Sequence, residues 1–269
     1  MKTHTGGELM IIGGAEDKQG ERVILKKVIE ITGGSGARLV VLTTATEEPE
    51  AIGSEYMNIF SRLGVEKLEI LDIHTREEAE NENFCRSIEK ADGVFFTGGD
   101  QLRITSILGG TRVYAAMHHA YRKGTVFIGT SAGASAMSNT MIVDGNDNGP
   151  ARKCTLKMAP GLGLLNDAII DQHFDQRGRI GRLLCGVAEN PHMLGIGIDE
   201  DTAVHVLPDN RFEVLGSNAV TVIDGQSIRS SNVSELRPDE ILAITGITLH
   251  ILPAGYGFDM SGREVLRLH

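Results

Sequence analysis

The sequence has few cysteines, no excess of basic residues and no long apolar run, and each shortage argues against a class of protein. Its 269 residues include three cysteines, Cys85, Cys154 and Cys185, which lie far apart and form no Cys-x-x-Cys pair. This spacing argues against a disulfide framework or a zinc ribbon and favours reduced thiols. No segment approaches the roughly 18 apolar residues of a membrane span, and the N-terminus lacks the apolar core of a signal peptide. We therefore expect a soluble, cytoplasmic protein with no membrane partner.

Net charge and missing fingerprints narrow the possible ligands. The formal net charge is −10, whereas a protein that binds nucleic-acid phosphates needs a basic face, so we expect no nucleic-acid partner. The glycine-rich fingerprints of dinucleotide and nucleoside-triphosphate sites, G-x-G-x-x-G and G-x-x-x-x-G-K-S/T, are both missing. No linker, repeat or low-complexity segment divides the chain, so residues 1–269 are predicted to form a single domain.

Short apolar segments alternate with segments of helical periodicity up to about residue 200, which indicates an α/β protein with a mostly parallel sheet. Strands are predicted over 9–14, 38–45, 67–73, 93–101, 125–130, 168–172 and 194–198. Helices are predicted over 23–31, from Glu48-Pro49 onward, over about 76–90, through Val113, Met117 and Ala120, and from Ile180 to Asn190. Beyond residue 200, a hairpin over 203–215 and strands over 220–224 and 248–252 are expected to extend one edge of this sheet.

The segment 125–137 contains the candidate nucleophile. An apolar β-branched run leads directly into Gly129-Thr130-Ser131-Ala132-Gly133, and small residues with helical spacing follow. This pattern predicts a strand, a tight turn and a helix, with the Ser131 hydroxyl exposed at the turn. Side chains at Gly129 and Gly133 would collide with the neighbouring strand and helix. The alternative is a connection of small residues in which the serine only caps the helix or is solvated.

Other strand ends support a site at this place. Paired glycines lie at the carboxyl ends of two predicted strands, at Gly13-Gly14 and Gly98-Gly99, and Thr43-Thr44 ends a third. In parallel sheets, ligands bind outside the carboxyl ends of the strands, so these segments are expected to face the same crevice as Ser131.

A serine nucleophile needs a base, and the base needs an orienting acid. The best base is His173, because an apolar strand ends there and a polar run begins. The other histidines fall in helices, connecting loops or late strands, where a structural role is expected. The residues leave four candidates for the acid: Asp171, Asp175, Asp199 and Glu200.

Three arginines follow the candidate base. Asp175 is expected to cap a helix on which Arg179 and Arg182 share one face, with Arg177 just before it. Guanidinium groups at this place can grip substrate carboxylates with two hydrogen bonds. The alternative is an ordinary solvated helix face.

The sequence resembles the cyanophycinases, a group of serine peptidases that also includes the aspartyl dipeptidases. The motifs that carry the resemblance are GGAEDK at 13–18, TGGDQ at 97–101, GTSAGA at 129–134 and DQHFDQRGR at 171–179. They occur in this order over nearly the whole chain. The resemblance implies a three-layer α/β/α fold like the class I glutamine amidotransferases and the flavodoxins. It also implies hydrolysis of cyanophycin, a polyaspartate with arginine on each β-carboxyl, to β-Asp-Arg dipeptides.

The resemblance assigns roles to particular residues. It implies Ser131 as nucleophile, His173 as base and Glu200 as orienting acid. The residues it implies for the substrate subsites are Gln101, Asp171, Gln172, Arg177, Arg179 and Arg182. We hypothesise that the backbone N–H groups of Gly99 and Ala132 form an oxyanion hole. The reaction would pass through an acyl-enzyme and need neither a metal nor a cofactor, and the family implies a homodimer.

Four alternatives remain at this point. A peptidase of the same family could act on short aspartyl or isoaspartyl peptides. An α/β-hydrolase would use Gly-x-Ser-x-Gly with a late histidine such as His250, although its HGGG-like motif is missing. A glutamine amidotransferase would need cysteine in place of Ser131. A flavodoxin-like domain could bind a ligand without any catalysis.

Overall fold

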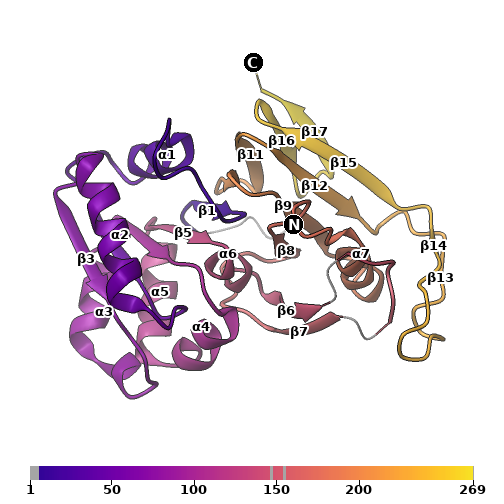
Figure 1. The fold of residues 1–269 in the computed structure, drawn as a ribbon, viewed down its shortest axis with the longest axis horizontal. Helices are drawn as coiled ribbons and strands as arrows, with labels where there is room; N and C mark the ends of the chain where they lie inside the picture. The colour runs from indigo at the N-terminus through magenta and orange to yellow at the C-terminus, as the bar shows by residue number, and fades with distance from the viewer. Residues whose placement is uncertain (1–5, 146–147, 154–155, 269) are drawn as a thin grey trace.

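A nine-stranded sheet lies at the centre of the molecule (Figure 1). The computed structural model describes residues 6–145, 148–153 and 156–268. The sheet order is β17-β16-β11-β10-β1-β5-β4-β2-β3. Its parallel half consists of β1 (Leu9–Ile12), β5 (Val126–Thr130), β4 (Gly93–Phe96), β2 (Arg38–Leu42) and β3 (Lys67–Leu71). Its antiparallel half consists of β10 (Thr202–Val206), β11 (Arg211–Gly216), β16 (Tyr256–Asp259) and β17 (Glu264–Arg267).

Helices cover both faces of the parallel half. One face carries α1 (Val23–Ile31) and α2 (Pro49–Arg62), and the other carries α3 (Glu82–Glu89), α4 (Gln101–Leu108), α5 (Arg112–Arg122) and α6 (Ala132–Ala136). Strand β1 shows why its sequence is continuously apolar. Met10 and Ile12 belong to the core under α1 and α2, while Leu9 and Ile11 belong to the core on the opposite face. The predicted α/β/α layers are thereby confirmed.

A second sheet of four strands lies beside the first, which the sequence did not predict. Its order is β15-β12-β9-β8, formed by β15 (Thr248–Pro253), β12 (Ala219–Asp224), β9 (Leu194–Ile198) and β8 (Ala168–Gln172). One face joins the main core, and α7 (Ile180–Glu189) packs on the other. The expectation that 220–224 and 248–252 extend the main sheet was therefore wrong. Apolar side chains on alternating faces look the same in either sheet.

Smaller elements complete the chain. Two hairpins are formed by β6 (Thr140–Gly145) with β7 (Leu156–Pro160), and by β13 (Ser230–Ser231) with β14 (Ile244–Thr245). The helix predicted over 76–90 is instead a short 3₁₀ turn (Glu78–Glu80) followed by α3. Asn81 separates the two, because its side-chain oxygen accepts from the Asn83 amide and starts a new helix there.

The remaining findings concern cysteines and membranes. Cys85 is a free thiol, and Cys154 lies outside the described residues. Among the residues that the structure describes, no helix combines the length and the apolarity that crossing a bilayer requires.

Candidate active site

Ser131 occupies a strained turn between β5 and α6. Its backbone angles are φ 54° and ψ −112°, a conformation that non-glycine residues rarely adopt. The turn is tight because α6 approaches the sheet closely. A Cβ on Gly129 would lie 2.5 Å from the carbonyl carbon of Gly133, and one on Gly133 would lie 2.6 Å from the carbonyl oxygen of Phe96. The two glycines thus have the steric role expected from the sequence.

Ser131, His173 and Glu200 form a continuous hydrogen-bonded chain. Ser131 Oγ lies 2.9 Å from His173 Nε2, and His173 Nδ1 lies 2.6 Å from Glu200 Oε1. A carboxylate only accepts hydrogen bonds, so the Nδ1 atom carries the proton and Nε2 presents its lone pair to the hydroxyl. This arrangement can take the serine proton when the oxygen attacks a carbonyl. The backbone amide of Glu200 donates to the side chain of Gln176 at 2.9 Å, which fixes the acid-bearing turn.

The three other candidate acids have different partners. Asp171 is buried and pairs with Arg182. Asp199 accepts backbone hydrogen bonds from Asp175 at 3.0 Å and from Ala219 at 3.2 Å. Asp175 is exposed. Of the four acids that the sequence left open, Glu200 is the one whose carboxylate meets the imidazole.

The environment of His173 suits a base that is neutral near pH 7. Burial lowers the pKa of the imidazole, because the charged form loses hydration. The hydrogen bond that His173 donates to Glu200 opposes this and raises the pKa, while the cations Arg177 and Arg179 lower it further. The net shift is downward from the usual 6.5.

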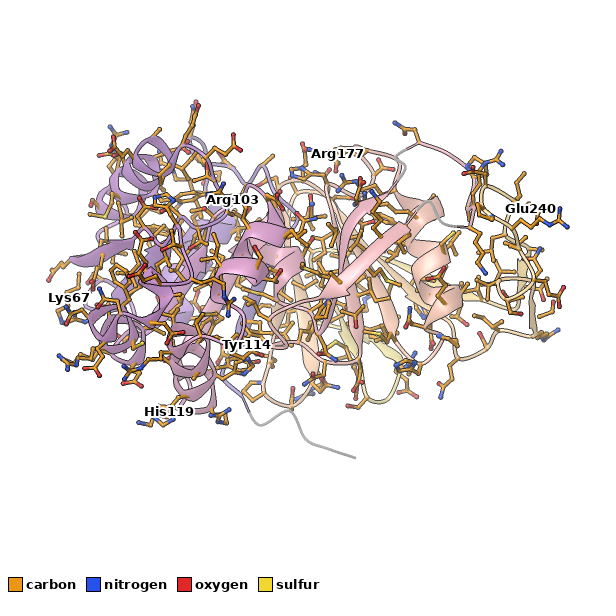
Figure 2. All side chains as sticks on the ribbon, turned by 90° about the horizontal axis from the view of Figure 1, so that it is seen from below. Lys67, Arg103, Tyr114, His119, Arg177 and Glu240 are labelled. Carbon is orange, nitrogen blue, oxygen red and sulfur yellow. The ribbon has the colours of Figure 1, made fainter. Side chains whose placement is uncertain are left out.

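Three of the proposed subsite residues lie on segments next to the serine and the base. Gln172, at the end of β8, has its side-chain oxygen 3.5 Å from Ser131 Oγ. Gln101 begins α4, and its amide nitrogen donates to the carbonyls of Ile142 at 3.0 Å and Val143 at 2.7 Å. Arg177 is exposed and points outward from the loop after His173 (Figure 2).

Asp171, Arg179 and Arg182 instead form a buried charged cluster. Arg182 is bidentate to Asp171, with Nε 2.7 Å from Oδ2 and Nη2 bonded to Oδ1. Arg179 lies 3.6 Å from the same carboxylate and donates to the Gln172 carbonyl at 2.6 Å. All three residues are at most 6% exposed. This differs from the expectation of guanidinium groups open to substrate, and also from a solvated helix face. Nor does Asp175 cap α7, because Arg179 occupies the N-cap position and makes no side-chain cap.

The loop after β4 places backbone amides beside Ser131. A Cβ on Gly98 would lie 3.5 Å from the Cβ of Ser131. The amides of Gly99 and Ala132 donate to no acceptor in the part of the chain that the structure describes. Gly99 has φ 143°, and a side chain there would meet the carbonyl oxygen of Ala45 at 2.1 Å. The turn therefore needs glycine to lie this close to the end of β2.

The turn after β1 also meets the site, as its glycines suggested. A Cβ on Gly14 would lie 2.4 Å from His173 Cε1, so the imidazole packs directly on this glycine.

The late histidine His250 lies on β15 of the second sheet. It pairs with Val222 across the second sheet, with its ring 5.5 Å from that of Phe258. This placement excludes the α/β-hydrolase arrangement.

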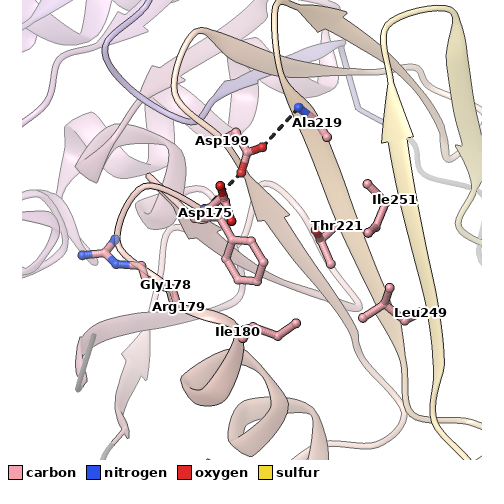
Figure 3. Close-up of a pocket in the computed structure, with 10 residues that line it drawn as sticks. Asp175, Gly178, Arg179, Ile180, Asp199, Ala219, Thr221, Leu249 and Ile251 are labelled. Carbon is pink, nitrogen blue, oxygen red and sulfur yellow. Dashed lines mark hydrogen bonds between the residues drawn. The ribbon is translucent and has the colours of Figure 1, made fainter. Parts of the chain in front are cut away.

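A cavity of about 420 Å³ lies between the loop after His173, the start of α7 and the second sheet (Figure 3). Its walls are mainly apolar, and the Asp199 carboxylate lies at one end. Burial raises the pKa of Asp199.

No group of three or more His, Cys, Asp or Glu side chains among the described residues is arranged to hold a metal ion.

One buried acid near the site was not predicted from the sequence. Glu16, in the turn after β1, is 4% exposed and bonds to Thr130, the residue before Ser131. The available signal was its position, because it follows a buried parallel strand at the end where ligands bind. In the sequence, Glu16 stood only as one residue of the GGAEDK motif, with no role of its own.

Comparison with known proteins gives one consistent group. The sequence profile of peptidase family S51 matches residues 9–215. The chain is 41% identical over 259 residues to the cyanophycinase of Trichormus variabilis. The aligned region covers 96% of this chain and 87% of that protein. The chain is 37% identical over 256 residues to the cyanophycinase of Geminocystis herdmanii, and that aligned region covers 95% of this chain and 94% of the relative. The fold is similar to that of a peptidase from an acI-B1 Actinobacterium, with a TM-score of 0.66, 20% identity and 99% of both chains covered.

Proposed function

The chain belongs to peptidase family S51, and on that premise we propose that it is a serine exopeptidase that hydrolyses cyanophycin to β-Asp-Arg dipeptides. The observation that carries the chemistry is the Ser131–His173–Glu200 hydrogen-bonded chain. The observation that carries the substrate is the identity to cyanophycinases over nearly the whole sequence. Serine at the nucleophile position, rather than cysteine, distinguishes this site from a glutamine amidotransferase.

The mechanism follows from the positions of these groups. His173 Nε2 accepts the Ser131 proton while Oγ attacks the scissile carbonyl, and the ionised Glu200 stabilises the imidazolium that forms. The amides of Gly99 and Ala132 donate to the developing oxyanion, each contributing about 3 kcal/mol. His173 then gives its proton to the leaving amine. Water, activated by the same imidazole, hydrolyses the acyl-enzyme and regenerates the serine.

Substrate recognition is divided between exposed and buried groups. Arg177 is accessible to a carboxylate of the polymer, and Gln172 offers an amide group near the serine. Gln101, whose amide nitrogen donates to two carbonyls, can offer its side-chain oxygen. Asp171, Arg179 and Arg182 contribute to the subsites from beneath the surface. The hydrogen bond from Arg179 to the Gln172 carbonyl supports this indirect role, because it holds the main chain of a residue that lies beside the serine.

The proposal also covers the domain organisation, the cellular location and the oligomeric state. Residues 1–269 act as one catalytic unit, which is supported by a central sheet that takes β1 and β17 from opposite ends of the chain. A cytoplasmic location agrees with the free thiol Cys85. A homodimer is proposed from the resemblance alone, and multi-angle light scattering measures it directly.

The test is to incubate insoluble cyanophycin with the wild-type protein and with Ser131→Ala, and to identify the soluble products by mass spectrometry. We expect β-Asp-Arg from the wild type only, with polymer binding retained by the variant. His173→Ala should also be inactive, while His250→Ala, a histidine of the second sheet, should remain active. Cleavage of short aspartyl peptides without release from the polymer would overturn the substrate assignment and keep the chemistry. Full activity of Ser131→Ala would overturn both.

A further inference from the structure

Glu16 is a buried carboxylate with two hydroxyl partners from different parts of the fold. Its Oε2 accepts from Thr130 Oγ1 at 2.6 Å, and its Oε1 accepts from the Tyr56 hydroxyl at 2.5 Å. Thr130 is the last residue of β5, and Tyr56 lies on α2. The side chain thus joins the turn after β1 to the strand end that carries the nucleophile. Tyr56 is itself buried, and burial together with the Glu16 charge raises the pKa of its phenol well above the usual value.

The end of β1 and the turn that carries Glu16 are bonded to the chain at Ser131, at His173 and at the residue after Glu200. The amide of Ser131 donates to the Ile12 carbonyl at 3.0 Å, and the amide of His173 donates to the Gly13 carbonyl at 2.8 Å. The amide of Asp201, next to Glu200, donates to the Gly14 carbonyl at 2.9 Å. One short segment therefore sets the relative positions of nucleophile, base and acid.

These attachment points are strained. Ser131, His173 and Asp201 have φ angles of 54°, 47° and 47°, in the left-handed region that non-glycine residues avoid. Such conformations persist only where the surrounding structure determines them strongly. A buried carboxylate is expensive to desolvate and adds little net stability, so a positional role explains this one better than a contribution to folding.

We propose that Glu16 is a positioning residue of the catalytic site, which holds the end of β5 against the β1–α1 turn through the Thr130 hydroxyl. In this role it keeps Ser131 Oγ within reach of His173 Nε2. Glu16 itself touches neither substrate nor the reacting atoms. The inference rests on the proposed Ser131 chemistry and adds a residue to it.

The test removes the Thr130 hydroxyl without changing the shape of the side chain. Thr130→Val breaks the bond to Glu16, and Thr130→Ser keeps it. Thr125→Val is the matched control, because Thr125 precedes the same strand at its other end and its buried hydroxyl donates to the Ala91 carbonyl at 3.0 Å. Both valine variants lose one buried hydrogen bond, and melting temperatures show whether they lose similar stability.

Rates are measured on a soluble synthetic oligomer of β-Asp-Arg units. We expect Thr130→Val to lower kcat about tenfold or more with KM changed less than about twofold, because a small misplacement of a reacting group acts on the chemical step. Thr130→Ser should recover most of this loss, and Thr125→Val should keep the wild-type kcat. Glu16→Gln should also lower kcat. Adding Thr130→Val to Glu16→Gln should lower kcat by a smaller factor than Thr130→Val does in the wild type, because the two substitutions break the same hydrogen bond.

Two results would overturn the positioning role: wild-type kcat in Thr130→Val, or an equal loss of kcat in Thr125→Val. If the wild type cleaves no oligomer, the substrate proposal fails separately. The comparison then uses the rate at which a fluorophosphonate labels Ser131, which does not depend on the substrate. Equal labelling rates in the two valine variants, or no labelling of wild-type Ser131, would also overturn it.

Discussion

Replacing Gly133 by alanine tests whether the close packing of α6 on the sheet positions the nucleophile. The new methyl group would lie 2.6 Å from the Phe96 carbonyl oxygen and 2.7 Å from the Phe96 Cβ. Ordinary contacts begin near 3.4 Å, so the methyl is about 0.8 Å too close to a rigid strand. The helix must move away from β4, and it begins at the residue after Ser131.

The expected magnitudes follow from this displacement. Overpacking of a core contact costs about 1–3 kcal/mol of unfolding free energy, offset in part by the helix propensity of alanine, about 1 kcal/mol better than glycine. Each net kcal/mol corresponds to a melting temperature lower by about 2–4 °C in a chain of this size. A shift of up to about 1 Å at the serine reduces the rate by as much as about 100-fold. We therefore expect a loss of about 10- to 100-fold in kcat.

The assay combines kcat, the melting temperature and the rate of Ser131 labelling by a fluorophosphonate. Gly186→Ala is the matched control, because this glycine is also buried in a helix. The nearest atom to its new methyl would be Leu156 Cδ2 at 3.2 Å, the end of a flexible side chain. This control should keep wild-type kcat and equal or greater stability. A Gly133→Ala enzyme with wild-type kcat would refute the argument that this approach places the nucleophile.

The remaining predictions concern charge. Glu200→Gln should lower kcat by about 10²–10³-fold through loss of the productive tautomer, less than for a fully buried acid because the carboxylate is 36% exposed. It should also move the acid limb of kcat/KM to lower pH, because the hydrogen bond that raises the His173 pKa is lost. Arg177→Ala should move the same limb to higher pH, since a cation that lowers that pKa is removed; equal or reversed shifts would contradict His173 as the base. Asp171→Asn should lower the unfolding free energy by about 3–5 kcal/mol in urea titrations, because Arg182 loses its buried partner. A loss below about 1 kcal/mol would contradict that account.

Local patterns were sufficient to predict most elements of the parallel half and the turn at Ser131. The apolar strand, the two glycines and the small residues of α6 are contiguous in sequence, and their steric reason is local. The same holds for α1, whose predicted bounds of 23–31 agree with the structure. His173 was identified as a strand-end histidine, and the structure places it 2.9 Å from the serine.

Other features depended on segments that meet only in the folded chain. The sequence left four acids open, because each follows or flanks an apolar strand, and only the packing of β8 beside β9 brings Glu200 to the imidazole. The pairing of strands far apart in the sequence also puts β12 and β15 in the second sheet instead of the main one. The packing of α7 on that second sheet brings Arg182 to Asp171.

The sequence by itself determined which segments become strands, helices and tight turns, because side-chain periodicity and glycine sterics act within a few residues. The tertiary structure decided which charged side chain meets which partner. Glu16 and Thr130 are 114 residues apart, and their 2.6 Å contact exists because β1 and β5 are neighbours in the sheet. Hydrogen bonds and ion pairs act over a few ångströms, and that proximity is a property of the fold rather than of any single segment.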